Sequence, residues 1–161
     1  MVDDDPADGT ITLEPIGTVT SPRTEKRDDH WGDVVAEIEL ADRFTPDALA
    51  GLETFSHVEV IFYMHRVRAA GIEDGARHPR NNTEWPELGI FAQRAKGRPN
   101  RLGLSRCAVI AVEGRRLRVR ALDAIDGTPV LDIKPYMREF GPRGTVTQPV
   151  WVGELMAEYY D

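Results

Sequence analysis

Residues 108–122 read Ala-Val-Ile-Ala-Val-Glu-Gly-Arg-Arg-Leu-Arg-Val-Arg-Ala-Leu, and this stretch predicts a β-hairpin. Two apolar, alternating runs flank the turn residues Glu113-Gly114-Arg115, which is typical of two antiparallel strands joined by a short loop. Side chains alternate between the faces of a strand, so three cations share one face of the second strand: Arg116, Arg118 and Arg120. We expect the opposite face to be buried and this face to contact water or an anionic partner.

The preceding segment, residues 89–105, reads Gly-Ile-Phe-Ala-Gln-Arg-Ala-Lys-Gly-Arg-Pro-Asn-Arg-Leu-Gly-Leu-Ser and predicts a loop of fixed shape. Pro99 has no amide donor and disfavours a helical conformation at Arg98, while the glycines permit sharp bends. Four cations lie in it: Arg94, Lys96, Arg98 and Arg101. The loop is either a binding element, as fixed loops often are, or a solvated basic connection between two strands.

Further short strands are predicted on both sides, at residues 10–19, 34–40, 57–64 and 130–133. A short helix over 46–52 should begin after Thr45 at Pro46, and a final strand or short helix is expected near residues 151–160. Residues 68–88 form a long polar loop. Many short strands with little helix predict a mainly β fold, either a barrel or a sandwich.

Composition limits the class of protein. With 161 residues, of which 41% are hydrophobic, the chain is large enough to bury the core of one domain. It has no run of about 18 apolar residues, and its acidic start is unlike a signal peptide, so a soluble, cytoplasmic protein without membrane contact is expected. The single cysteine, Cys107, excludes an internal disulfide and is expected to be a small buried residue.

Charge is distributed unevenly along the chain. The net charge is -7, yet the segment from Arg94 to Arg120 contains nine cations and only one anion, Glu113. Residues 1–42 are rich in carboxylates. The fold therefore either presents a basic face to a polyanion or lets the two halves neutralise each other.

Several common site motifs are missing from the sequence. It contains neither the glycine fingerprint of dinucleotide-binding folds nor a phosphate-binding loop, and no Gly-x-Ser-x-Gly elbow of a serine hydrolase. His57 and His65 could lie on one face of a strand, but they would be too far apart to share a metal directly, so no metal site is expected.

Five blocks resemble the TsaA-like family, also called TrmO or YaeB. The longest is residues 122–136, Leu-Asp-Ala-Ile-Asp-Gly-Thr-Pro-Val-Leu-Asp-Ile-Lys-Pro-Tyr, which is long enough to be specific. The others are residues 89–94, residues 98–105, Pro15-Ile16-Gly17 with Ser21-Pro22, and Gly51-Leu52-Glu53 with Phe55-Ser56-His57. The resemblance covers residues 14–137.

The resemblance implies a small β-barrel with a few short helices, commonly a homodimer, that uses S-adenosylmethionine to methylate tRNA. The implied reaction is N6-methylation of threonylcarbamoyladenosine just 3′ of the anticodon. We accordingly divide the chain into a disordered acidic N-terminus (1–9), a barrel domain (10–140) and a C-terminal extension (141–161) that packs on the barrel or on a partner subunit.

By the same resemblance, cofactor contacts are expected at seven positions: His65, Arg66, Phe91, Arg94, Leu104, Leu122 and Asp123. Arg94 suits the cofactor's carboxylate, and Asp123 suits its ammonium or a ribose hydroxyl. The leucines suit apolar walls, and Phe91 or Tyr136 an aromatic face. From residue type alone, Asp123 could equally start a turn, and His65 could end a strand.

For the reaction we expect direct methyl transfer, assisted by a base or an oxyanion-stabilising cation near the acceptor nitrogen. The sequence leaves four candidates open for that group: Asp132, Lys134, Tyr136 and His65. Phosphates of tRNA are expected at Arg98, Arg101, Arg116 and Arg118, and Trp31 or Trp85 can stack on an exposed base.

Two features depart from the family pattern. Residues 29–33, Asp-His-Trp-Gly-Asp, stand where many members have a Pro-x-Gln-like segment, and the chain stops 25 residues past Tyr136, where longer members carry a further domain. Two other interpretations therefore stay open: a methyltransferase of the same fold acting on a small molecule, and a non-enzymatic barrel that binds cofactor or RNA.

Overall fold

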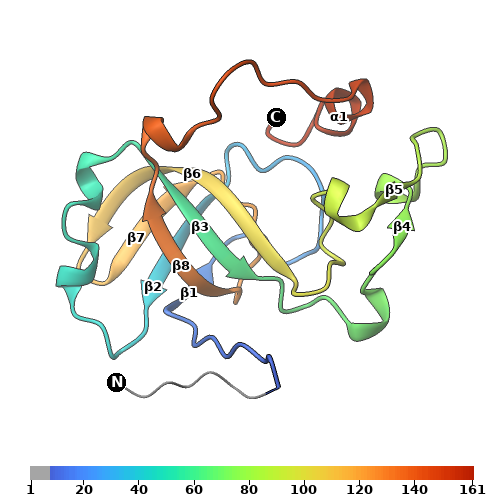
Figure 1. Ribbon diagram of the computed structural model, residues 1–161. Coiled ribbons are helices and arrows are strands. Elements are labelled where there is room, and N and C mark those ends of the chain that lie inside the picture. The colour runs from blue at the N-terminus through green and yellow to red at the C-terminus, as the bar shows by residue number, and fades with distance from the viewer. Residues whose placement is uncertain (1–7) are drawn as a thin grey trace.

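The computed structural model describes residues 8–161, and its centre is a closed barrel of six antiparallel strands (Figure 1). The order around the barrel is β1 (Gly17–Thr20), β2 (Val35–Leu40), β7 (Arg116–Arg120), β6 (Leu102–Glu113), β3 (His57–Tyr63) and β8 (Pro129–Pro135). The predicted mainly β barrel is confirmed, and a sandwich is excluded. Most of the segment 1–9, expected to be disordered, lies outside the described residues.

The predicted hairpin is confirmed as β6 and β7. Leu117 and Val119 of β7 are fully buried in the barrel, while the arginines that alternate with them in the strand are exposed. Alternate residues of β2 and β3 complete the core in the same way, because successive side chains of a strand point to opposite faces. Cys107 also lies in this core, as expected, and burial, aided by the charge of Asp123, raises the pKa of its thiol to about 12.

Strand β6 is longer than the sequence predicted. It begins at Leu102, inside the segment expected to be a loop, and pairs with β3 from Tyr63 to His57. Gly103 makes this pairing possible, because a Cβ atom there would lie 2.3 Å from the ring of Phe62. Gly103, which was expected to bend a loop, is instead part of β6 and leaves room for the ring of Phe62 on the neighbouring strand β3.

Two other elements differ in extent from the prediction. The first strand was expected over 10–19 but covers only Gly17–Thr20. The helix expected over 46–52 is two 3-10 turns, η1 (Pro46–Leu49) and η2 (Leu52–Thr54). Gly51 separates them with a φ of +93°, a left-handed conformation that ends the first turn and that glycine adopts without strain.

The long polar segment between β3 and β6 is ordered by short elements. It contains η3 (Ala69–Gly71), β4 (Ala76–Arg77), η4 (Pro79–Asn81), β5 (Leu88–Gly89) and η5 (Ile90–Ala92), with β4 and β5 forming a separate two-stranded sheet. The buried amide of Gln93 donates to the carbonyl oxygens of Arg77 and Leu88, both at 2.8 Å. These bonds tie β4 and β5 to the loop that leads into β6.

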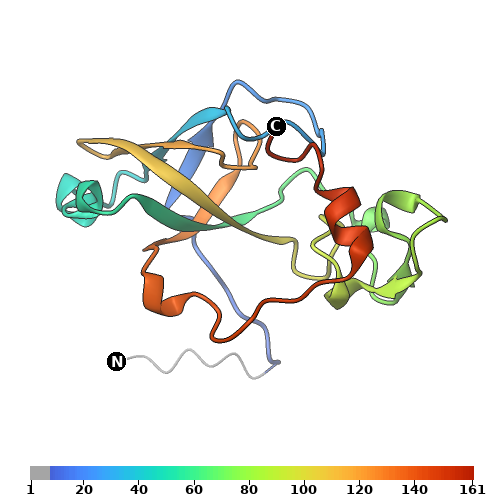
Figure 2. The ribbon, with the colours of Figure 1, turned by 90° about the horizontal axis from the view of Figure 1, so that it is seen from above.

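After β8 the chain forms η6 (Arg138–Phe140), the helix α1 (Val150–Leu155) and a terminal segment. Figures 1 and 2 show α1 beside the β4–β5 region, and the C-terminus returning over the barrel. The indole of Trp85 donates to Glu154 at 2.7 Å and packs near Trp151, with ring centroids 6.3 Å apart. No helix within residues 8–161 has the length and apolarity needed to cross a membrane.

Candidate functional site

A pocket of about 1020 Å³ lies at one end of the barrel. Its walls come from six segments: residues 26–31, the end of β3 with residues 64–67, residues 77–81, residues 91–104, residues 123–128, and the C-terminal residues 151–160. Segments far apart in the sequence meet here, because β3 ends at the pocket, β6 begins there, and the loop between β7 and β8 lies there too. A pocket of this size can hold a nucleoside-sized ligand.

Six of the seven residues expected to contact the cofactor line this pocket: His65, Arg66, Phe91, Arg94, Leu104 and Asp123. Leu122 does not, because its side chain is fully buried in the barrel core. The two neighbours therefore separate: Leu122 stabilises the fold, and Asp123 faces the pocket.

Asp123 is the only described carboxylate of the pocket whose side chain keeps a buried oxygen free. Its Oδ2 accepts a hydrogen bond from the hydroxyl of Tyr159, while Oδ1 is inaccessible to solvent and has no hydrogen-bond partner among the described residues. A buried carboxylate oxygen without a donor is costly. A ligand's ammonium or hydroxyl group that reaches Oδ1 would supply the missing hydrogen bond.

His65 lies just after β3, next to the loop between β7 and β8 that carries Asp123. Its Nε2 lies close to Gly127, since a Cβ atom on that glycine would be 3.8 Å away, and its Nδ1 is buried with no partner in the part of the chain that the structure describes. Burial and then the charge of Arg66 lower the pKa of His65. The imidazole is neutral at pH 7 and can accept a proton.

The lowered pKa of His65 predicts a dependence of stability on pH. The folded state binds a proton at His65 less readily than the unfolded chain, whose histidine pKa is about 6.5. The contribution of His65 to stability is therefore complete above about pH 6.5 and is lost as the pH falls through the folded pKa. We expect urea midpoints of the wild type to fall faster below pH 6.5 than those of His65→Gln. Parallel curves for the two proteins would contradict this.

The rim of the pocket is strongly basic. Eight cations line it: Lys26, Arg27, Arg66, Arg77, Arg80, Arg94, Lys96 and Arg98. Among residues 8–161 only two carboxylates line it, Asp28 and Asp123, and Asp28 is paired with Lys96 at 3.0 Å. Arg94 donates to the carbonyl oxygen of Leu104 at 2.6 Å, which fixes its guanidinium against β6. Such a rim attracts an anionic ligand or a polyanion.

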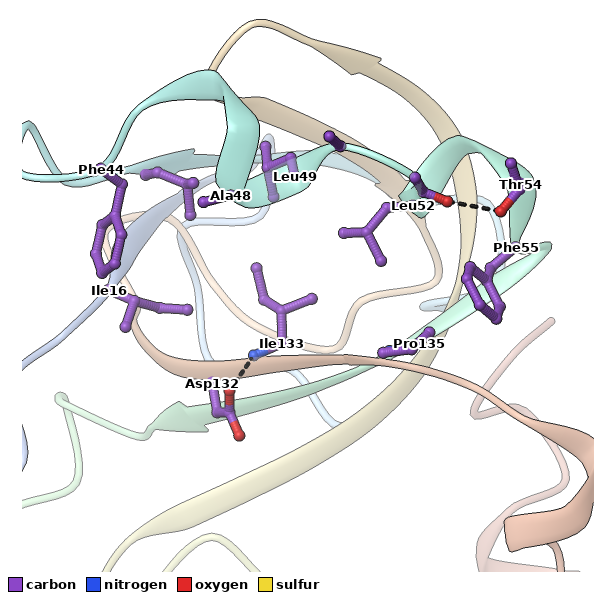
Figure 3. A pocket seen from close by; sticks show the side chains of 13 residues that line it. Ile16, Phe44, Ala48, Leu49, Leu52, Thr54, Phe55, Asp132, Ile133 and Pro135 are labelled. Atoms are coloured by element: carbon purple, nitrogen blue, oxygen red, sulfur yellow. Dashed lines mark hydrogen bonds between the residues drawn. The ribbon is translucent and has the colours of Figure 1, made fainter.

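Three of the four candidates for the catalytic group lie elsewhere. Asp132 is at a second pocket, of about 560 Å³, between β8 and the 3-10 turns (Figure 3), and it forms an ion pair with Lys134 at 2.9 Å. Tyr136 lies under the guanidinium of Arg106, 5.0 Å from the ring centroid. The first pocket includes none of these three residues, so His65 alone of the four lies with the expected cofactor residues.

The four arginines expected to contact RNA are also divided. Arg98 lines the pocket and donates to the carbonyl oxygen of Gln93 at 2.8 Å, and Arg101 donates to the hydroxyl of Tyr63 at 2.6 Å. Arg116 and Arg118 lie on the outer face of β7, opposite Glu39 and Glu37 of β2. Arg116 is paired with Glu39 at 3.1 Å, so carboxylates offset part of the charge of this face.

Two sets of pocket residues were not assigned to the cofactor from sequence. Trp31, a candidate for stacking on an RNA base, is only 3% exposed, lines the pocket and packs under Arg23. The C-terminal residues Trp151, Tyr159 and Tyr160 also line the pocket, although the sequence did not predict this. Their signal was three large aromatic residues in a polar terminal segment of 21 residues, which needs a surface to cover.

Comparison with known families identifies the barrel. A sequence model of the tRNA-methyltransferase O N-terminal domain matches residues 20–141. The chain belongs to this family. The TrmO family was the one indicated by the blocks at residues 89–105 and 122–136, which supply 17 of the 36 residues that line the pocket.

Relatives of the chain carry consistent descriptions. A probable S-adenosyl-L-methionine-binding protein from Methanothermobacter thermautotrophicus is 36% identical over 86% of this chain and 98% of its own length. The tRNA (adenine(37)-N6)-methyltransferase of Escherichia coli is 34% identical over an alignment that covers 80% of this chain and 58% of that enzyme. A crystal structure of TrmO from Pseudomonas aeruginosa superposes with a TM-score of 0.68 at 31% identity, covering 88% of this chain and 62% of that one.

Proposed function

We propose that the chain is an S-adenosylmethionine-dependent methyltransferase that acts on N6 of threonylcarbamoyladenosine next to the tRNA anticodon. The observation that carries the proposal is the convergence of six expected cofactor residues on one pocket that contains a free, buried carboxylate oxygen. Membership of the TrmO family and the descriptions of its relatives support tRNA rather than a small molecule as the acceptor.

The donor groups of the pocket fit the cofactor. S-adenosylmethionine, when bound, supplies an electrophilic methyl group on a sulfonium centre. The free Oδ1 of Asp123 suits its ammonium or a ribose hydroxyl, Arg94 suits its carboxylate, and the exposed ring of Phe91 suits an aromatic or sulfonium contact. One donor of the ligand thus has a charged acceptor in the pocket, and its carboxylate has a cation.

The chain's own residues provide alignment and a proton acceptor. A nitrogen that gains a methyl group must lose its proton, and the neutral imidazole of His65 can take it. Because Nδ1 is buried, Nε2 is the nitrogen that can accept this proton. The surrounding cations would stabilise the negative charge that develops on the acceptor as its proton leaves. Most of the rate enhancement would then come from holding two reactants in line.

The same proposal places tRNA at the basic rim. Arg98 and its neighbours can neutralise phosphates of the anticodon loop while the target base enters the pocket. The outer face of β7, with Arg116 and Arg118, and Arg101 beside Tyr63, extend the surface along the backbone of the tRNA. The proposal includes that the protein is a cytoplasmic homodimer. The proposed tRNA substrate supports the location, and the dimers common in the family support the assembly.

Arg98→Ala should weaken tRNA binding more than Arg116→Ala. Arg98 lies at the pocket, whereas the charge of Arg116 is already partly neutralised by Glu39. We expect the plot of log affinity against log salt concentration to become less steep by about one charge for Arg98→Ala. Filter binding of tRNA at four salt concentrations measures this. A larger loss in Arg116→Ala than in Arg98→Ala would mean that the RNA lies mainly on the β7 face and not at the pocket.

The function itself is tested by methyl transfer. Purified protein, labelled S-adenosylmethionine and tRNA carrying threonylcarbamoyladenosine should give labelled tRNA, while the same tRNA without the modification serves as control. Calorimetric titration of the cofactor alone is done first. Cofactor binding without transfer to any tRNA would overturn the proposed acceptor, and no cofactor binding by folded protein would overturn the methyltransferase itself.

A further inference from the structure

The last residues of the chain form part of the pocket. After α1 the backbone runs beside residues 30–32, where the amide of His30 donates to the carbonyl oxygen of Glu158 at 2.9 Å and that of Trp31 donates to Tyr159 at 2.8 Å. We call residues 156–161 the tail segment. Two consecutive backbone bonds of this kind fix it in register, and they direct the side chain of Tyr159 to Asp123.

Segment 30–32 is shaped to receive the tail segment. A Cβ atom on Gly32 would lie 1.9 Å from the carbonyl oxygen of Tyr160, so any larger residue would displace the tail. His30 has a φ of 65°, which turns its amide for the first backbone bond at some conformational cost. Arg80 orders the approach to this segment by binding Asp29 through two bonds, at 2.7 and 3.1 Å. The residues that depart from the family pattern are therefore those that hold the tail.

The hydroxyl of Tyr159 is a permanent donor to Asp123. Burial, and then the charge of Asp123, raise the pKa of Tyr159 far above neutrality, so it stays protonated. The bond uses Oδ2 and leaves Oδ1 free and buried beside the pocket. Without Tyr159 the carboxylate could rotate and share both oxygens with water, and the preorganisation of Oδ1 would be lost.

We propose that Tyr159 is a positioning residue, which holds the Asp123 carboxylate so that Oδ1 meets the cofactor, and that the tail segment is a fixed wall of the site. This inference rests on the proposed function. The tail is a wall and does not plug the site, since about 1020 Å³ of space remains with Tyr159 and Tyr160 in place.

The test compares two conservative variants. Tyr159→Phe removes only the hydroxyl that binds Asp123, while Tyr63→Phe removes a hydroxyl outside the pocket, which accepts a hydrogen bond from Arg101 at 2.6 Å. We expect calorimetry to show S-adenosylmethionine binding weakened about 10-fold by Tyr159→Phe and unchanged by Tyr63→Phe, at equal melting temperatures. Equal affinities in the two variants, with a wild type that binds, would overturn the inference but not the proposed function.

A double-mutant cycle separates positioning from a general structural role. In an Asp123→Asn background, Tyr159→Phe should have little further effect on affinity, because the group it positions has lost its charge. Additive losses would overturn the inference. Gly32→Ala gives an independent check, because it displaces the tail without altering either partner, and it should weaken cofactor binding as Tyr159→Phe does. Tighter binding by Gly32→Ala would mean that the tail obstructs the pocket.

Discussion

Asp123→Ala should reduce the affinity for S-adenosylmethionine by about 30-fold or more. The substitution removes the charged acceptor at the centre of the pocket and leaves the ligand's donor, together with the hydroxyl of Tyr159, without a partner. Losing one member of a desolvated, hydrogen-bonded charge pair costs about 2–5 kcal/mol, and about 1.4 kcal/mol corresponds to a tenfold change. Calorimetric titration of wild type and variant measures the difference.

A matched control is available in Asp42→Ala. The side chain of Asp42 is 98% exposed, its one ion pair is with Arg115, and it does not line the pocket. Both variants lose one negative charge, so any effect of net charge on cofactor binding is common to them. A similar loss of affinity in the two would show that the carboxylate of Asp123 makes no specific contact with the ligand.

Alternation along short strands was sufficient to predict a mainly β fold, and the family resemblance selected a barrel over a sandwich. The pattern of β7 placed Leu117 and Val119 inside, and both are fully buried. The arginines that alternate with them are exposed. The start of β6 was missed because glycine and proline near residues 97–103 indicate a loop when read locally. Only the partner strand shows why Gly103 belongs to β6, since the ring of Phe62 occupies the space of its missing side chain.

The site was predictable to the extent that it lies in contiguous blocks. The family resemblance brought His65, Arg94 and Asp123 to one pocket, but it gave Leu122 the same role as its neighbour. Alternation along β7 would also have placed Leu122 outside, with the arginines; a φ of 66° at Ala121 breaks that alternation, and Leu122 is fully buried. The contribution of the tail could not be predicted. Tyr159 lies 36 residues from Asp123 in sequence, and the contact depends on a backbone register between residues 30–32 and the tail that no local pattern specifies.

Leu117→Ala should have the largest effect on stability. Leu117 is 0% exposed, at the centre of the barrel core, and pairs in register with Ile38 of β2 and Val112 of β6. Shortening a buried leucine removes its transfer free energy and leaves a cavity that a closed barrel cannot collapse, at a cost of about 2–5 kcal/mol. Against a total stability of about 5–15 kcal/mol for a domain, the loss is large enough to measure by urea unfolding.

Leu13→Ala makes the same chemical change at a position that is 60% exposed and should shift the unfolding free energy by less than about 0.5 kcal/mol. Leu117 does not line the pocket, so folded Leu117→Ala should keep the cofactor affinity of the wild type while losing stability. This is the reverse of the pattern expected for Asp123→Ala, which loses affinity through a group outside the apolar core. If Leu117→Ala and Leu13→Ala destabilised the protein equally, the barrel interior would not be the packed core described above. If Leu117→Ala also abolished cofactor binding below its melting temperature, the pocket would depend on the shape of the whole barrel rather than on its rim segments.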